Sequence, residues 1–533
     1  MKKLMSSIVI GVFLSLNIFA NQKLTTDDKN DIILSELNKQ QMVEDFDFLI
    51  KIFKESYPKF DIAEKVYGID MVKILESYKK RITGNETPEE FIDLLIKATQ
   101  QCKADHFGIA PVSVYCSDEG KKYRFWFDGL VKNDDYIITQ KYLKEHYKKR
   151  NKQPRVHLPL FYKNKNLYLM FDIINDGKKY PANLKLVSYN GKTTLELLKQ
   201  YQSKFSKYDS VNKLFYDDRS FITKIVDKDS DSLILIFEDE NGEKHQYDLS
   251  KKCAYPKELL SKMQVASKLN KKSVKYIKKD KILIIRIPTM YPKYIDFYKQ
   301  NIIKEAANKK INAIILDIRN NSGGSDKVWN NILKNIIAEP INLKTTLAYR
   351  KGGLVEIYLK NRFGKDWPSK FELQKIPYLK NIEYRVYDED IKIEPSQKSL
   401  NFTGPIFILC QNNYSSASSL AILAKASPRF ITIGPKNNID VGVGINPMIF
   451  SLPNSRIIMT FGCDTDISYC KTTKDTMHLY TNVEISGSNY LLEYYNALDK
   501  APKSFDNNQK VEWLYNQLSE IDPFYKKALE LIK

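Results

Sequence analysis

AIILDIRNNSGGS, residues 313–325, is the stretch of sequence that decides the fold. Its first four residues form an uninterrupted apolar run, which is typical of a strand buried on both faces. The chain then turns polar and reaches the glycine pair Gly323-Gly324. Paired glycines let backbone N–H groups point into a site with no Cβ in the way. We therefore expect a functional loop here, because parallel sheets place their sites at the carboxyl ends of strands.

Strands and helices alternate around this stretch. Apolar runs at 282–287, 406–409 and 430–433 predict strands, and the amphipathic segments between them predict helices. Such a pattern indicates a parallel sheet that right-handed crossovers cover on both faces. Residues 261–533 are therefore predicted to form an α/β core.

A second strand-to-helix junction, QNNYSSASS at 411–419, follows the strand at 406–409. A serine at such a junction exposes its hydroxyl beside helix N-terminal amides, which would stabilise an oxyanion. A serine-rich helix cap is the alternative interpretation. The two junctions together favour a site, since one supplies a hydroxyl nucleophile and the other supplies amides.

The N-terminus resembles a secretory signal peptide over residues 1–20. Lys2 and Lys3 precede an apolar run that ends on small Ala20. An uncleaved anchor is the alternative, but the run is short for a membrane span. We expect an exported protein, periplasmic or secreted, with no integral membrane span in its mature form.

Two further regions precede the core. Residues 21–115 are predicted to form a helical unit, with a helix start at Thr87-Pro88-Glu89-Glu90. Residues 116–260 are predicted to be β-rich, from alternating aromatics at 123–127 and a hairpin turn at Asn241-Gly242.

The net charge of +20 is unevenly spread, since residues 121–165 alone carry thirteen Lys/Arg and four Asp/Glu. A solvated basic face is the plainer interpretation of this stretch, and we expect no nucleic-acid partner.

Six cysteines are permitted to form disulfides in an exported protein. Cys463 and Cys470 bracket a short loop, and so do Cys102 and Cys116, so we expect two local disulfides. Cys410 ends an apolar strand and is expected to be a core thiol. No C-x-x-C pair occurs, so we predict no metal and no cofactor.

A serine nucleophile needs a base, and the chain has five histidines. His106 follows Asp105 at the end of the helical unit, and a base and a structural histidine are both open there. The other four lack a convincing polar setting: His146, His157, His245 and His478.

These motifs resemble the core of the tail-specific, C-terminal-processing serine peptidases and their tricorn-core relatives. The family's D-x-R-x-N-x-G-G pattern matches residues 317–324, and its S-A-S elbow matches residues 416–418. Asp105-His106 resembles the histidine segment of tricorn-like members, and residues 184–198 resemble the family's PDZ-like module.

The resemblance implies a crotonase-like (ClpP-like) ββα core with a PDZ-like module. It also implies roles for particular residues: Ser416 as nucleophile, His106 as base, Glu484 as the acid that orients the base, and Gly323 or Gly324 with Ala417 as oxyanion donors.

The chain departs from the lysine-dependent members of the family. The loop that carries their lysine reads Ile439-Asp440-Val441-Gly442 here, and Lys436 is out of register. Ser419 replaces an acid of the family pattern. A Ser/His arrangement is therefore preferred to a Ser/Lys dyad.

The sequence predicts an exported serine-type endopeptidase that acts on peptides or proteins through an acyl-enzyme. One alternative is an inactive relative that binds peptides or protein C-termini. Another is an exported protein that binds a small ligand.

Overall fold

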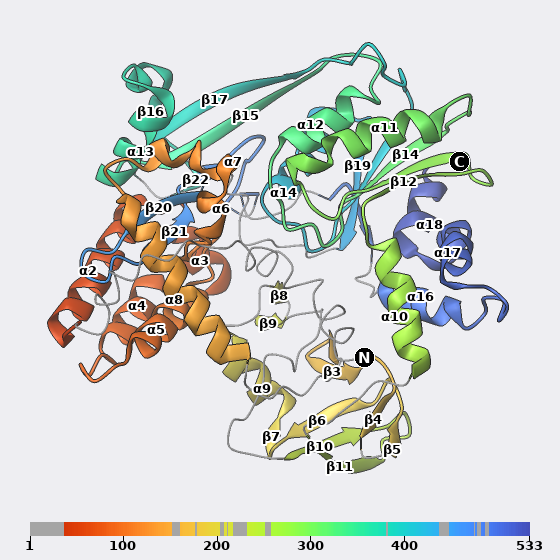
Figure 1. Ribbon diagram of the computed structural model, residues 1–533, viewed down its shortest axis with the longest axis horizontal. Coiled ribbons are helices and arrows are strands. Elements are labelled where there is room, and N and C mark those ends of the chain that lie inside the picture. Colours follow the sequence, from red (N-terminus) through yellow and green to blue (C-terminus); the bar gives the residue numbers. More distant parts are fainter. Residues whose placement is uncertain are drawn as a thin grey trace.

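The computed structural model is a mixed α/β protein with several sheets (Figure 1). One lobe holds the N-terminal helices, a second lobe holds an α/β core, and a β-rich module lies below them in this view. The structure describes residues 37–151, 160–175, 178–202, 207–209, 212–216, 232–250, 257–379, 382–435, 447–473, 475–476, 481–485 and 490–532.

The core is built on a six-stranded sheet of order β12-β13-β14-β18-β19-β23. The last five strands run parallel, and only β12 is antiparallel to its neighbour. The predicted parallel sheet is therefore present. Its strands are β12 (Ser273–Ile277), β13 (Ile282–Arg286), β14 (Ala313–Asp317), β18 (Ile406–Leu409), β19 (Phe430–Pro435) and β23 (Val483–Ile485).

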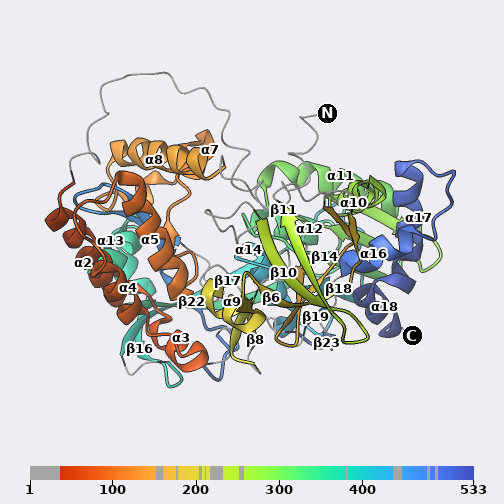
Figure 2. The same cartoon turned by 90° about the horizontal axis from the view of Figure 1, so that it is seen from below.

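Both faces of this sheet are buried because successive side chains enter different hydrophobic clusters. Leu283 and Ile285 pack in one cluster, and Ile282 and Ile284 pack in the other. Helices cover the sheet on both sides (Figures 1 and 2). The first layer holds α11 (Ile295–Ala306), α12 (Lys327–Lys334), α14 (Ser416–Ala421) and α15 (Leu423–Ala426). The second holds α10 (Lys257–Leu269), α16 (Tyr490–Leu498), α17 (Asn507–Ile521) and α18 (Pro523–Glu530).

The N-terminal unit is helical, as its apolar spacing predicts. Thr87 caps α5 with a capping box that includes Glu90, and Pro88 is its first residue. The unit contains α2 (Lys39–Ser56), α3 (Phe60–Tyr67), α4 (Met71–Lys79), α5 (Pro88–Cys102), α6 (Ser113–Cys116), α7 (Asp118–Lys121) and α8 (Asn133–Asn151), with a 3-10 turn, η1 (Arg124–Phe127).

The β-rich region starts later than the sequence suggests. We expected strands from residue 116 on, with aromatics alternating at 123–127, but residues 113–151 are helical wherever they are regular. The alternation instead reflects η1, in which Phe127 is buried while Phe125 is 51% exposed. The first strand of the module begins at Leu160.

The β-rich module itself has the predicted hairpin, which turns at Asn241-Gly242. Helix α9 (Thr194–Tyr201) packs against β6. The strands are β2 (Leu160–Lys163), β3 (Asn166–Leu169), β4 (Ile173–Asn175), β5 (Lys178–Tyr180), β6 (Lys185–Tyr189), β7 (Lys192–Thr193), β8 (Lys207–Asp209), β9 (Leu214–Tyr216), β10 (Ser232–Glu238) and β11 (Lys244–Ser250).

A long antiparallel ribbon of β15 (Ile341–Arg350) and β17 (Glu383–Ile393) crosses from one lobe to the other (Figure 1). Leu343 packs in a core-sheet cluster, whereas Leu347 packs with the N-terminal helices. The remaining elements around the ribbon are η4 (Pro292–Tyr294), α13 (Gly353–Phe363), η5 (Trp367–Lys370), β16 (Glu372–Lys375), β20 (Pro447–Ser451), β21 (Ile458–Gly462) and β22 (Asp464–Asp466).

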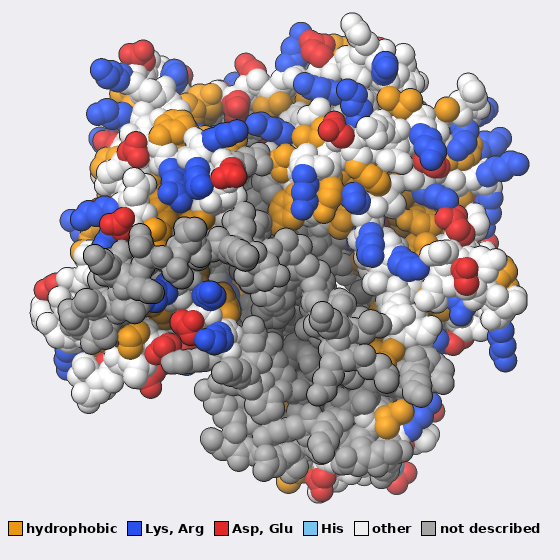
Figure 3. All heavy atoms as spheres, in the orientation of Figure 1, with side chains coloured by type: hydrophobic (Ala, Val, Ile, Leu, Met, Phe, Trp, Pro, Cys, Tyr) orange, Lys and Arg blue, Asp and Glu red, His pale blue; other side chains and the backbone are white. Residues whose placement is uncertain are grey.

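Some predictions concern residues outside the described ranges. They include the signal peptide at 1–20, His157, Cys253, Lys436, the loop at 439–442 and His478. Among the helices that are described, none combines the length and hydropathy of a membrane span. Lysine and arginine side chains are spread over both lobes on the face that Figure 3 shows, with acidic side chains between them.

Candidate active site

The two strand-to-helix junctions meet at the carboxyl edge of the core sheet. Strands β14 and β18 are parallel neighbours, with Asp317 opposite Leu409. A Cβ added to Gly323 would lie 2.7 Å from the Ser415 Cβ and 2.7 Å from the Tyr414 oxygen. It would also lie 3.1 Å from the Ser416 nitrogen. The Gly-Gly loop is thus packed directly onto the serine elbow, at a distance that only glycine permits.

The elbow has a strained backbone. Ser415 has φ 53° and ψ −129°, a conformation that residues other than glycine rarely adopt. Helix α14 begins at the next residue, Ser416, whose side chain is 95% buried. Strain of this kind is concentrated at functional sites, where the surrounding structure enforces it. The sharp turn places the Ser416 hydroxyl at the start of a helix, beside the Gly-Gly loop.

The amides around Ser416 differ in their availability. The Gly323 N–H donates to Asn321 Oδ1 at 2.8 Å, and the Ala417 N–H donates to the Tyr414 oxygen at 3.2 Å. The Gly324 N–H has no acceptor among the described residues. Of the three predicted oxyanion donors, Gly324 is therefore the one whose amide is available in this structure.

A half-buried acid, Asp326, accompanies the nucleophile candidate, and the sequence pattern did not indicate it. Burial raises the pKa of Asp326, and the nearby Ser416 hydroxyl and the Trp329 indole oppose that rise. The indole nitrogen lies 2.9 Å from Asp326 Oδ1. The position of Asp326, three residues after Gly323, is the feature of the sequence that could have indicated this residue.

His106 reaches the site through a short strand. Residues Gly108–Ile109 form β1, which pairs with β21, so that Gly108 lies opposite Thr460. The N–H of His106 donates to the Tyr414 hydroxyl at 2.7 Å, and the two ring centroids are 4.8 Å apart. The predicted base is therefore held against the loop that carries Ser416, and Tyr414 is the residue that joins them.

Burial favours the neutral form of His106, and the two charges beside it act in opposite directions. Asp105 Oδ1 accepts a hydrogen bond from the Tyr57 hydroxyl at 2.7 Å, and its Oδ2 lies 3.4 Å from the buried Lys59 ammonium. Burial lowers the pKa of His106, Asp105 opposes this shift and Lys59 reinforces it. A general base must be unprotonated at working pH, and this environment supplies that condition.

The predicted third residue, Glu484, lies on the edge strand β23 opposite Gly434. Its side chain is exposed, and among the described residues the structure gives it no contact with His106. The role of Glu484 therefore stays a prediction. His146 and His245 lie elsewhere, next to Asp93 and Asp239 respectively.

The structure forms neither predicted disulfide, since no disulfide joins any two of the five described cysteines. Cys102 is buried among the N-terminal helices, whereas Cys116 lies 3.5 Å from an Arg124 nitrogen. Cys463 is buried in the N-terminal lobe, and the Cys470 thiol instead contacts carbonyl oxygens of its own turn. The sulfurs of each pair thus face different surroundings, so bracketing a loop was not sufficient to pair them.

One group of described side chains has the composition of a metal site. Ligand atoms of Asp239, Glu243 and His245 lie within 4.8 Å of one another in the β10–β11 hairpin. The hairpin belongs to the β-rich module, so this group is not part of the two strand-to-helix junctions.

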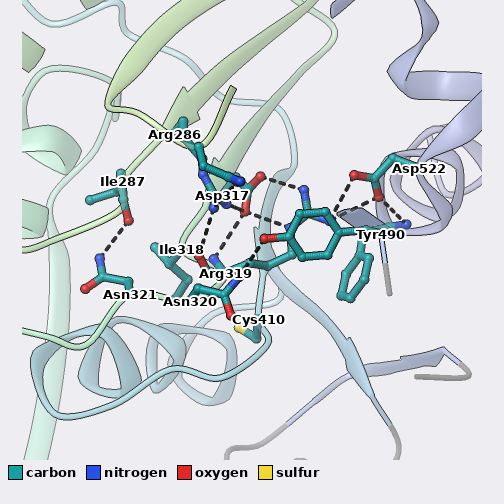
Figure 4. A network of polar contacts seen from close by, with 12 residues as sticks. Arg286, Ile287, Asp317, Ile318, Arg319, Asn320, Asn321, Cys410, Tyr490 and Asp522 are labelled. Carbon is teal, nitrogen blue, oxygen red and sulfur yellow. Dashed lines mark hydrogen bonds and ion pairs between the residues drawn. The ribbon is translucent and has the colours of Figure 1, made fainter. Parts of the chain in front are cut away.

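An ion-pair network surrounds Asp317 and Arg319 at the end of β14 (Figure 4). Arg319 binds Asp317 through two nitrogens, at 2.9 and 2.7 Å, and binds Asp522 of the C-terminal helices at 2.9 Å. Arg286 pairs with the same Asp317 carboxylate. Burial alone would raise the pKa of Asp317, but the two guanidinium groups lower it to about 2. The D-x-R part of the motif therefore anchors the loop rather than contacting Ser416.

Comparisons with known proteins show what one segment of the chain and its fold are similar to. Residues 281–461 match the family model described as peptidase family S41. A structure of mature CPAF complexed with lactacystin shares 12% identity and a TM-score of 0.52, covering 91% of this chain and 99% of that chain. A structure of mature CPAF gives the same identity and TM-score, with 91% and 98% covered.

A photosystem II D1 C-terminal processing protease shares 11% identity and a TM-score of 0.36, covering 84% of this chain and 93% of that chain. No curated protein matches the sequence. The match of residues 281–461 to the model of peptidase family S41 confirms the predicted resemblance to the C-terminal-processing serine peptidases.

Proposed function

We propose that this protein is an exported serine endopeptidase that cleaves peptide bonds through an acyl-enzyme on Ser416. The observation that carries the proposal is the contact between Gly323 and the Ser415-Ser416 backbone. It brings an available amide, that of Gly324, to the same place as a hydroxyl at a helix start. This is the combination that acyl transfer requires.

In the proposed reaction the Ser416 oxygen attacks the carbonyl carbon of the scissile bond while His106 takes the hydroxyl proton. The Gly324 N–H, and the Ala417 N–H if it leaves the Tyr414 oxygen, donate to the oxyanion. His106 then returns the proton to the leaving amine, and the C–N bond breaks. Water hydrolyses the resulting ester by the same route, with His106 again as base.

The other parts of the chain have roles in this proposal. Glu484 would orient His106 from the same carboxyl edge of the sheet, and the core would be crotonase-like. The β-rich module, with α9 packed on β6, would act as a PDZ-like module that binds the substrate peptide. The signal peptide would direct the protein to the periplasm or the exterior.

A serine-directed fluorophosphonate probe tests the proposal. We expect wild-type protein to be labelled at Ser416, and Ser416→Ala to abolish labelling with little loss of stability. Ser418→Ala, the matched control two residues along the same helix, should keep most of the labelling. Loss in Ser418→Ala but not in Ser416→Ala would move the nucleophile by two residues. No labelling of a folded protein that still binds peptides would establish the inactive binding relative instead.

A further inference from the structure

Tyr490, the first residue of α16, contacts an amide bridge between the two loops of the site. Asn320 donates from Nδ2 to the Tyr490 hydroxyl at 2.6 Å. Asn412 donates from its own Nδ2 to Asn320 Oδ1 at 2.8 Å. Asn320 belongs to the loop of Gly323, and Asn412 belongs to the loop of Ser416. A single hydroxyl from the C-terminal helices therefore holds the group that joins the oxyanion loop to the nucleophile loop.

The bridge connects two unusual backbone positions. Asn320 has φ 61° and Asn412 has φ 55°, so both lie in the left-handed region. Asparagine tolerates this region better than most residues, but the conformation still has a cost. The Asn320 N–H also donates to the Gln411 oxygen at 2.7 Å. Main-chain and side-chain bonds thus fix the two loops to each other at this point.

Tyr490 is itself held in place by Arg319, which stacks on its ring (Figure 4). Its side chain is 97% buried, and its ring centroid lies 3.9 Å from the Arg319 guanidinium carbon. Arg319 is bound in turn by Asp522, which also caps α18. Arg319, which carboxylates fix, stacks on the ring of Tyr490 while the hydroxyl of that ring accepts from Asn320.

We propose that Tyr490 is a positioning residue that sets the separation of the Gly324 amide and the Ser416 hydroxyl through the Asn320–Asn412 bridge. The inference rests on the proposed peptidase function. It makes the C-terminal helices part of the machinery that aligns the site. Alignment matters because small displacements of reacting groups have large effects on rate.

Tyr490→Phe tests this role, because it removes the hydroxyl and keeps the ring on Arg319. Tyr515→Phe is the matched control, since its hydroxyl bonds the Ser273 hydroxyl at 2.7 Å in the same helical layer, and Ser273 belongs to neither loop. We expect Tyr490→Phe to lower probe labelling of Ser416 and peptide kcat by about 3- to 10-fold, the effect of one lost hydrogen bond. KM should change less than about 2-fold, as expected when binding is kept.

Hydrogen exchange gives a readout that does not depend on activity. Amide hydrogens of residues 318–325 and 411–416 should exchange faster in Tyr490→Phe than in the wild type. In Tyr515→Phe they should exchange at the wild-type rate. If wild-type protein is not labelled, the proposed function fails, and exchange alone decides whether Tyr490 positions the loops. Unchanged labelling together with unchanged exchange in Tyr490→Phe would overturn the inference.

Asn412→Gly supplies a second test, since glycine accepts the left-handed backbone and lacks the bridging amide. It should reproduce the loss of labelling, including in the event that Tyr490→Phe does not fold. The double variant should lose no more than the worse single variant, because both changes break one bridge. Losses that multiply would show that the two residues act independently and would overturn the bridge.

Discussion

Gly323→Ala tests the contact that brings the two halves of the site together. The added Cβ would lie 2.7 Å from both the Ser415 Cβ and the Tyr414 oxygen, closer than van der Waals contact. Gly323 also has φ +93°, which costs an L-residue about 1–2 kcal/mol. Relieving the overlap adds about 1–3 kcal/mol, as overpacking does elsewhere. We expect the free energy of unfolding to fall by about 2–5 kcal/mol.

The matched control is Gly191→Ala in the β-rich module. Gly191 has φ +77°, and a Cβ there would meet nothing within 4 Å, so only the backbone cost applies. Urea denaturation gives the two stabilities, and probe labelling gives the rate at Ser416. Because the elbow must shift to admit the methyl group, Gly323→Ala should slow labelling about 100-fold, while Gly191→Ala should not. Equal stabilities and wild-type labelling of Gly323→Ala would refute the contact.

Further predictions concern titration and thiols. Since burial lowers the pKa of His106, the labelling rate should rise with pH below about pH 6.5 and then level off. His106→Gln should lower the labelling rate by several orders of magnitude, whereas Lys436→Ala should change it little. The reverse ranking of the two variants would identify a lysine base. Burial raises the pKa of Asp466 from 3.8 to about 6, so its contribution to stability is lost as pH rises through about 6. Asp466→Asn should therefore raise the free energy of unfolding by up to about 3 kcal/mol at pH 7.5 and by about 1 kcal/mol at pH 4.5, and an equal gain at both would exclude this cause. Mass mapping of non-reduced peptides should find no bridge between Cys102 and Cys116 and none between Cys463 and Cys470, whereas a bridged peptide would contradict the structure.

The core strands were predictable because they are buried on both faces. An apolar run such as 313–316 needs no periodicity, since every position faces a hydrophobic cluster. The sequence also indicated that the two strand-to-helix junctions lie close together, because neighbouring parallel strands end at the same edge of a sheet. The strand prediction at residues 123–127 was wrong, because a short amphipathic turn with alternating aromatics resembles a half-buried strand.

The residues that reach the site through contacts distant in the sequence show no local sequence pattern. The two-residue strand at Gly108–Ile109 brings His106 to the core through pairing with β21, and two residues cannot show a period. Tyr490 looks like any buried aromatic of an amphipathic helix, and only the fold places its hydroxyl on Asn320. Motif residues were therefore accessible from sequence, whereas the residues that position them were not.

The bond between the His106 backbone and the Tyr414 hydroxyl joins residues 308 positions apart, and the bond from Asn320 to Tyr490 spans another 170. A chain that is still being synthesised lacks one or both. Proteolytic competence would thus arrive late, after the last helices have docked on the sheet. The order of synthesis would keep the proposed peptidase inactive until the segment that carries Tyr490 has docked.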